Sequence, residues 1–427
     1  MSTGAGTVTA APTGAAPTGA APTGAAPTGM ASDELDEFRR ATRAALSKAP
    51  RPRDVAEPSG QQESAAWEKG ARKALGSLGA FGLLVDEANG GSAAGFVAMT
   101  VVLQEVGRAG VGRWFSSSAV AAARLLADEA DTVLGHRLLP DLASGARVVT
   151  VAVTGPSGRY DLAGIAVTAT TEGEGNGDGA VLTGVADFVP ALADADCVVV
   201  AARLADGPVG GGPVGGGPVG GGGVGLFVVD RTDDGVVYGP GDRFGLNGLA
   251  SLRLDGVRVP AARVLRRGLD ADRLADLVAA GAVAVSAEMV GSAARVLELT
   301  VAYAGDRQQF GSPIGAFGTV QHHCVQMRTD VQTARAVTNR AAAAFDVAAL
   351  DVDSLGAPNP DALWLASAAK AWTARATRRV VGRAHRVHGA IGFSAEHELP
   401  RHTAGQRDSW ALWGDPRFHA GRIASGL

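Results

Sequence analysis

The spacing of apolar residues divides the chain into a helical part, a strand-rich part and a second helical part. Residues 31–146 carry apolar side chains three and four positions apart, as in DELDEFRRATRAAL and AMTVVLQEVGRAG, which is the period of an amphipathic helix. Residues 147–268 carry short β-branched runs bounded by Gly, Asp and Pro, such as VVTVAV, CVVVAAR and GLFVVD, which predict strands. Residues 269–427 return to the helical period. The pattern predicts an N-terminal α domain, a middle β-barrel or β-sandwich domain and a C-terminal helical domain.

The C-terminal part is expected to form an antiparallel four-helix bundle. Long apolar periods predict helices from about residue 270 to 305, from about 320 to 349 and from about 359 to 387. The last of these has Asn359 as a suitable N-cap and Pro360 in its first turn. A final stretch from about residue 395 completes the set. Long helices with short connections favour a bundle, and the chain is therefore assigned to a multidomain α+β class.

Two low-complexity segments interrupt this pattern. Residues 1–30 are dominated by copies of AAPTG, and Pro and Gly every five residues predict a disordered tail. Residues 207–223, GPVGGGPVGGGPVGGGG, lie between two strand-like runs and are interpreted as an expanded loop of the β domain. A phosphate-binding glycine loop requires a helix after it, whereas a strand follows here.

Composition excludes several classes of function. The net charge of −4 argues against nucleic acid as a partner, and no polybasic stretch indicates a membrane surface. Cys197 and Cys324 each lie in an apolar run, which favours free thiols in a reducing compartment and predicts a cytoplasmic protein. Seven of the eight histidines follow residue 320, but none forms an HExxH pair, so no metal site is expected.

The segment RQQFGSPIGAFG, residues 307–318, joins two of the predicted long helices. The guanidinium group of Arg307 is a planar fork suited to a phosphate or carboxylate. Phe310 and Ile314 are able to anchor the turn, while Gly311 and Gly315 permit a tight backbone. From these residues alone, a plain helical hairpin with a surface arginine is the favoured interpretation.

The same segment resembles the R-x-Q-F-G-x-P-I-x-x-F signature of the acyl-CoA dehydrogenase family. VHGAIGFSAEHEL, residues 387–399, resembles the second C-terminal signature of that family, G-x-x-G-[FY]-x-x-E. Further similar stretches are LGAFGLLVDEANGG (78–91), QEVGRAG (104–110), LRLDGVRVPAARVL (252–265) and HHCVQMRTDVQTARA (322–336). The resemblance covers residues 31–425 in order.

The resemblance implies a flavoprotein that dehydrogenates an acyl-CoA or acyl-carrier thioester between its α and β carbons. A carboxylate removes the α-proton while hydride passes to FAD, which lies between the β domain and the bundle. It also implies a homo- or hetero-oligomer, a dimer of dimers, with an electron-transfer flavoprotein or a similar protein as acceptor. By position, the cofactor-binding residues are Thr154, Phe188, Arg307, Gln309, Phe310, Arg386, Gly389 and Ala390. Of these residues, Arg307, Gln309 and Phe310 would contact the FAD of a partner subunit.

The positions of the usual catalytic glutamate carry no carboxylate. Counting from Phe393 without gaps places Trp413 at the usual Glu, and an indole nitrogen is a donor only. Counting back from Phe310 places Gly281 at the alternative Glu position found in some members. Glu288 lies seven residues further on the same helix face, about 10 Å along the axis, and is a weak substitute. No catalytic residue is therefore assigned.

The presumed flavin site also departs from the family pattern. Arg386 replaces a Gln, and VTGPSGRYD (153–161) keeps Thr154, Pro156 and Asp161 of the flavin loop, but Gly155 and Tyr160 replace its Glu and Ser. FVPA (188–191) keeps an aromatic residue in Phe188, whereas Pro190 replaces a Thr and has no N–H to donate. Ala404-Gly405 stands where the family has R-D.

Three functions remain open on this basis. The first is an acyl-CoA dehydrogenase-like oxidoreductase with an unusual base. The second is a catalytically silent subunit of a heteromeric acyl-CoA dehydrogenase, which contributes FAD contacts and interface to a partner. The third is a degenerate member that binds neither flavin nor acyl-CoA.

Overall fold

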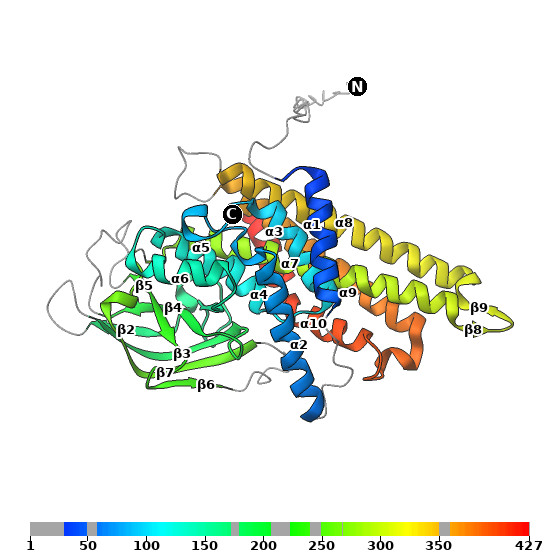
Figure 1. Ribbon diagram of the computed structural model, residues 1–427. Coiled ribbons are helices and arrows are strands. Elements are labelled where there is room, and N and C mark those ends of the chain that lie inside the picture. Colours follow the sequence, from blue (N-terminus) through cyan, green and yellow to red (C-terminus); the bar gives the residue numbers. More distant parts are fainter. Residues whose placement is uncertain are drawn as a thin grey trace, which may run out of the picture.

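Helices, a sheet and a second set of long helices follow one another along the chain, as the hydrophobic pattern predicts (Figure 1). The computed structural model describes residues 30–48, 58–171, 179–205, 223–239, 249–266, 268–349 and 359–426. The predicted tail, apart from Met30, and the predicted loop at 207–223, apart from Gly223, lie outside the described residues.

Among the N-terminal helices, α3 is buried along most of its length and packs on α1 and on α7 (Ala271–Asp306) of the C-terminal bundle. The helices are α1 (Ser32–Ser47), α2 (Pro58–Ser77), α3 (Gly95–Ala109), α4 (Trp114–Ser116), α5 (Ala123–Leu126) and α6 (Val133–Ala143). A single π-helical segment, Ser117–Ala122, joins α4 to α5. Apolar residues of α2, α3 and α7 form one shared core.

The middle domain is one mixed sheet in the described part of the chain. Its strands are β1 (Val149–Ala152), β2 (Thr168–Thr171), β3 (Ala180–Pro190), β4 (Cys197–Leu204), β5 (Val224–Asp230), β6 (Val236–Tyr238) and β7 (Leu249–Val259). The order is β1-β4-β2-β3-β7-β6, with β5 on the free side of β4. β4 pairs in parallel with β1 and β2 and antiparallel with β5, so it connects all the strands into one sheet.

The bundle helices lie close to their predicted positions. They are α7 (Ala271–Asp306), α8 (Gly318–Ala349), α9 (Pro360–His388), α10 (Leu399–Ala411) and α11 (Pro416–Ser425), and the hairpin β8 (Gln308–Gln309) with β9 (Ser312–Pro313) joins α7 to α8. The Asn359 side chain accepts the N–H groups of Asp361 and Ala362, which confirms the predicted cap. α7 is long and apolar enough to cross a membrane, but 94% of its most apolar window is buried within the protein, as in a core helix.

α3 and α7 approach until their backbones touch. A Cβ atom on Gly107 would lie 1.9 Å from the carbonyl oxygen of Glu288, and one on Gly291 would lie 1.8 Å from that of Gln104. Real Cβ atoms essentially never come this close to backbone, so glycine is required at both positions. The N-terminal domain is thereby fixed on the bundle.

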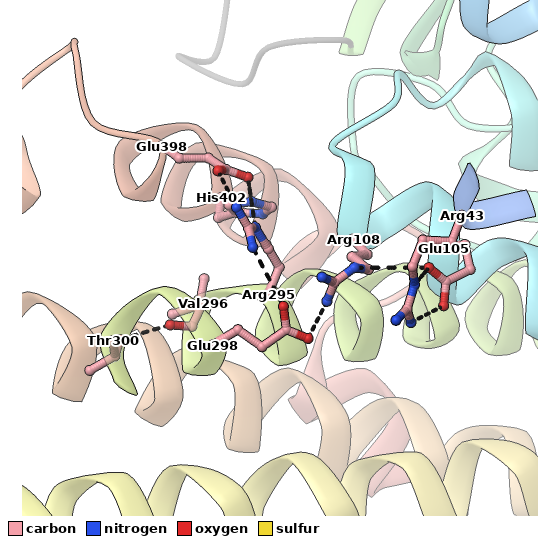
Figure 2. Close-up of polar contacts among 9 residues, drawn as sticks. All are labelled: Arg43, Glu105, Arg108, Arg295, Val296, Glu298, Thr300, Glu398 and His402. Atoms are coloured by element: carbon pink, nitrogen blue, oxygen red, sulfur yellow. Dashed lines mark hydrogen bonds and ion pairs between the residues drawn. The ribbon is translucent and has the colours of Figure 1, made fainter. Parts of the chain in front are cut away.

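A chain of alternating charges reinforces this junction (Figure 2). It links α1, α3, α7 and α10 through Arg43, Glu105, Arg108, Glu298, Arg295, Glu398 and His402. Arg43 is bidentate on the buried carboxylate of Glu105, at 2.8 and 2.7 Å, and this geometry gives the strongest type of ion pair. At the other end, Arg295 grips Glu398 with two nitrogens, which ties α10 to α7.

Both cysteines are free in the structure, as predicted. Cys197 is buried in β4, and Cys324 is half-buried on α8. Burial raises the pKa of the Cys197 thiol to about 12, so this sulfur is an inert core atom.

Candidate functional site

The turn between α10 and α11 lies against the β domain and forms one wall of a cavity of about 380 Å³. Its lining residues are Gly158, Arg159, Tyr160, Asp161, Phe188, Leu249, Ala411, Leu412, Gly414, Asp415 and Phe418. The cavity therefore unites three segments that the sequence analysis singled out separately: the loop at 153–161, the strand end at Phe188 and the segment around Trp413. Its volume is in the range typical of small-molecule sites.

Two hydrogen bonds, one to its N–H and one to its carbonyl group, hold the backbone of Trp413 in an unusual conformation. Its φ of 59° is in the left-handed region, and its side chain is 5% exposed. Its backbone N–H donates to the Tyr160 hydroxyl at 2.9 Å, and its carbonyl accepts from Nε2 of His419 at 2.8 Å. Burial, followed by the nearby Lys370 charge, lowers the pKa of His419 to about 3, so the ring is neutral with its proton on Nε2.

The side chain of Lys370 also holds this turn in place. This lysine is fully buried in α9, and its ammonium group donates to the carbonyl oxygens of Ser409, Trp410 and Gly414, each at 3.0 Å. The three donors of the side chain are thereby used. The last carbonyls of α10 have no partner within their helix, and Lys370 supplies one.

Gly281 and Trp413, the two positions that the gap-free counts assign to the expected glutamate, meet in space, and neither holds a carboxylate. A Cβ atom on Gly281 would lie 2.4 Å from Cδ2 of the Trp413 indole. Because Gly281 has no side chain, the Trp413 indole can pack directly against α7. The gap-free counts from Phe310 and Phe393, made independently, lead to the same point in the structure.

Glu288, the weak substitute base, lies in a different cavity. Its side chain is 6% exposed and pairs with Arg113 at 3.3 Å. Burial raises the pKa of its carboxyl group, and the Arg113 charge only partly opposes that effect. The carboxylates that do line the first cavity are Asp161 and Asp415, which accept backbone N–H groups at the starts of a 3-10 turn and of α11.

Of the predicted cofactor residues, Phe188 lines the first cavity, and Thr154 lies behind it. Phe188 has a φ of 59°, which directs its ring off the strand at a break in the pairing of β3 with β7. The Thr154 hydroxyl is buried and donates to the carbonyl oxygen of Asp187 in β3 at 2.6 Å. This donor is therefore used within the β domain and is not among the groups that line the cavity.

Arg386 lies in a basic groove on the other side of the α10–α11 turn. The groove has a volume of about 570 Å³ and is lined by Arg375, Arg378, Arg379, Gly382, Arg383, Arg386, Trp410, Pro416 and Arg417. Arg379 and Arg383 share the carboxylate of Asp330, each at 2.6 Å. So much positive charge in one groove of an acidic chain is suited to an anionic ligand.

The remaining cofactor residues lie at the far end of α7, on the β8–β9 hairpin and the end of α9 (Figure 1). Phe310 is 93% exposed with a φ of 54°, and Gln309 and Arg307 are exposed beside it. Tyr303 stacks on His388 at 4.6 Å, which brings Gly389 and Ala390 to the same end. Arg307 is 26 residues from Gly281 on one helix, about 40 Å along its axis. It cannot reach the cavity of its own chain.

Known proteins identify this architecture. Sequence profiles of the acyl-CoA dehydrogenase N-terminal domain and of the acyl-CoA dehydrogenase C-terminal domain match residues 32–146 and 272–410. The chain belongs to the acyl-CoA dehydrogenase family. The resemblance drawn from the RQQFGSPIGAFG and VHGAIGF segments, and the α–β–α fold inferred from periodicity, are both confirmed.

The similarity extends over most of the chain. A probable acyl-CoA dehydrogenase of Bacillus subtilis, YngJ, is 26% identical over 336 residues, 77% of this chain and 82% of its own. The cyclohex-1-ene-1-carbonyl-CoA dehydrogenase of Geobacter metallireducens is 27% identical over 354 residues, 79% and 84% of the two chains. The structure of the ChsE4-ChsE5 complex from Mycobacterium tuberculosis superposes with a TM-score of 0.73 at 24% identity, covering 93% of this chain and 97% of that one.

Sequence reasoning missed the residues that hold the turn. Lys370 stands alone among small residues in ASAAKAW, and this isolated charge within a buried helix face was an available signal. Tyr160 was noted only as a departure from a family Ser, and His419 only as one of several histidines. Their partners lie 253 and 6 residues away in the chain, at Trp413.

We expect Gly281→Ala to destabilise the protein by about 1–3 kcal/mol, because the new methyl group would overlap the Trp413 indole. Gly305→Ala, on the same helix with nothing within 4 Å of the added atom, is the matched control. It should be neutral or stabilising by up to about 1 kcal/mol, since alanine is the better helix former. Urea unfolding measures both; equal effects would show that Trp413 does not fill this space.

Lys370→Met should lower the free energy of unfolding by about 3 kcal/mol or more, because it leaves three buried carbonyl groups without a donor. Lys73→Met, at an exposed position of α2, should change it by less than about 0.5 kcal/mol. Denaturant titration of both variants is the measurement. A small loss for Lys370→Met would mean that the turn has other anchors.

Proposed function

We propose that the chain acts as an FAD-dependent oxidoreductase on the CH–CH bond next to the carbonyl of an acyl-CoA thioester. The observation that supports this proposal best is the aromatic cavity between the β domain and the α10–α11 turn, because the resemblance to the family leads to its lining residues. Phe188, Tyr160 and Phe418 offer flat apolar walls to a planar ring. The basic groove on the other side of the same turn fits the phosphates of the same dinucleotide.

Bound FAD would supply the acceptor for hydride, and the residues of this chain would supply position and charge. We assign Phe188 to the ring and Arg386 to a phosphate. Arg307, Gln309 and Phe310, with Gly389 and Ala390, would contact the FAD of a partner subunit. The roughly 40 Å between Arg307 and the cavity of its own chain supports a contact across the subunit interface. The guanidinium group of Arg307, with its five donors, is too far away to bind a cofactor in that cavity.

The proton acceptor differs from that of the usual family member. Trp413 and Gly281 stand at both positions of the usual glutamate. Among the residues that line the aromatic cavity, Asp161 and Asp415 are the carboxylates. Asp415→Asn is the informative variant, because Asn caps a helix as well as Asp does but cannot take a proton.

We further propose that the protein is an oligomer in the cytoplasm and that an electron-transfer flavoprotein accepts its electrons. The comparisons favour the oxidoreductase over a catalytically silent partner subunit, the second function that the sequence left open. A silent subunit would still use the exposed hairpin, so the purified chain must be tested alone.

The first experiment is a visible spectrum of the purified protein, followed by addition of acyl-CoA thioesters without air. A flavin spectrum that bleaches on addition is the expected result. In Asp415→Asn the bleaching should slow by about 100-fold or more if Asp415 accepts the proton. A flavin that no thioester bleaches, or a colourless protein that reconstitutes with no flavin, would contradict the proposed activity.

Arg307→Ala should reduce the flavin content of the assembled protein several-fold, since it removes the cross-subunit phosphate contact. Arg328→Ala, on α8 outside both cavities and the groove, is the control and should keep full flavin content. Flavin released by heating and quantified by absorbance is the readout, with the oligomeric state checked by light scattering. Unchanged flavin in an intact oligomer would remove Arg307 from the cofactor site.

A further inference from the structure

Three histidines lie together where α9 ends and the chain turns toward α10 (Figure 1). We call His385, His388 and His397 the histidine cluster. The ring centroids of His388 and His397 are 4.9 Å apart, and Tyr303 of α7 stacks on His388 at 4.6 Å. His385 stacks on Phe393 at 4.4 Å. The cluster therefore packs the segment that follows α9 onto the bundle.

Hydrogen bonds fix which nitrogen carries the proton in the two rings on α9. Nδ1 of His388 lies 2.9 Å from the carbonyl oxygen of Ala384, which can only accept, so the proton is on Nδ1. Nε2 of His385 lies 2.8 Å from Oγ1 of Thr403, and that hydroxyl donates its own proton to the carbonyl oxygen of Leu399. Nε2 of His385 is therefore the donor of that ring. Each ring is neutral and has a second nitrogen without a proton.

The second nitrogen of each ring is buried and has no hydrogen-bond partner among the described residues. These atoms are Nε2 of His388 and Nδ1 of His385. Gly392 packs against both histidines, because a Cβ atom there would lie 3.0 Å from Cβ of His388 and 3.3 Å from Nδ1 of His385. A proton on either nitrogen would make a buried donor without an acceptor, which native proteins nearly always avoid. This packing therefore accepts only the neutral rings.

His397 resists a second proton for a different reason. Its Nδ1 accepts the backbone N–H of Leu399 at 3.1 Å, so a proton there would set two donors against each other. Glu398 is the carboxylate that favours a charged His397. Its oxygens already accept from Arg295 at 3.1 and 2.9 Å, and one lies 3.2 Å from Nε2 of His402 (Figure 2). Little of that negative charge is left for the cluster.

Positive groups lie around the cluster on the packed helices. Arg383 and Arg386 are on the last turns of α9, and together with His322 they act on His323 of α8. Glu396, next in the chain to the last histidine of the cluster, is exposed. Burial is the largest effect that lowers the pKa of all three cluster histidines, and charge on a neighbouring ring lowers it further.

We propose that the histidine cluster is an acid-sensitive switch, which holds residues 389–397 on the bundle at neutral pH and releases them below about pH 6. Once released, the rings are exposed and titrate near the ordinary value of about 6.5, whereas the packed rings exclude the second proton. The released state therefore binds more protons, and acid favours it. The packed state is fully favoured above about pH 6.5 and is lost as the pH falls below that value.

The released segment includes Gly389 and Ala390, which we assigned to the flavin of a partner subunit. Acid would therefore weaken that contact as well, and this consequence rests on the proposed function. The switch itself follows from the packing of the cluster within one chain.

The test is hydrogen exchange, followed by mass spectrometry, on the full-length protein at about pH 7.5 and at about pH 5.5, with rates normalised to those of an unfolded chain. Protection of residues 389–397 should fall about tenfold for each ring that must gain a proton, hence on the order of 100-fold for His385 and His388. His388→Phe keeps a stacking ring without a titrating nitrogen, so the fall should shrink by about tenfold. His136→Gln, at an exposed position of α6, should leave the full fall.

A purely structural role of His388 would lower protection equally at both pH values, so the ratio between them decides. Equal protection at both pH values, an equal fall in α6, or a full fall in His388→Phe would each overturn the switch. If His388→Phe does not fold, as judged by circular dichroism, His385→Gln is the second variant, because its amide keeps a donor for Thr403 but does not titrate. The exchange measurement needs no thioester, so its failure is distinct from that of the proposed function, which bleaching tests.

Discussion

The site depends on one buried lysine side chain, that of Lys370, whose pKa is lowered by burial to about 7. Lys370 reaches from the middle of α9 to three carbonyl oxygens of the segment that ends α10. That segment contains a bulky residue with positive φ, Trp413, which persists only where its surroundings determine it. Tyr160 and His419 form two further hydrogen bonds with the backbone of Trp413. One wall of the aromatic cavity follows from the position of this turn.

The contact between Gly281 and Trp413 joins the two positions that the gap-free counts assign to the usual glutamate. A large indole on the turn requires a residue without a side chain at this position of α7, because a Cβ atom on Gly281 would lie 2.4 Å from the ring. The pair also closes the space in which the usual glutamate would act. Chemistry at this site must therefore draw on groups other than a glutamate at these two positions.

The length of α7 separates the exposed hairpin from the cavity at the Trp413 turn. One end of this helix lies beneath Trp413, and the other carries the exposed hairpin with Arg307 and Phe310. Close backbone contact with α3 and the alternating charges from Arg43 to His402 keep the N-terminal domain and α10 fixed on that helix (Figure 2). Such a frame holds the two ends of α7 at a constant separation.

The sequence by itself determined the helices, most strands and the family. The limits of α7, α8 and α9 follow from apolar period and from local caps such as Asn359, which involve neighbours a few residues away. β6 escaped prediction because three half-exposed residues carry no pattern. Sheet order, the meeting of Gly281 with Trp413 and the roles of Lys370 and Gln406 were decided by tertiary structure. The contact of Gly281 with Trp413 and the hydrogen bonds from Lys370 to Ser409 and from Gln406 to Met289 join residues 39 to 132 positions apart, and pairing at that range leaves no periodic trace in the chain.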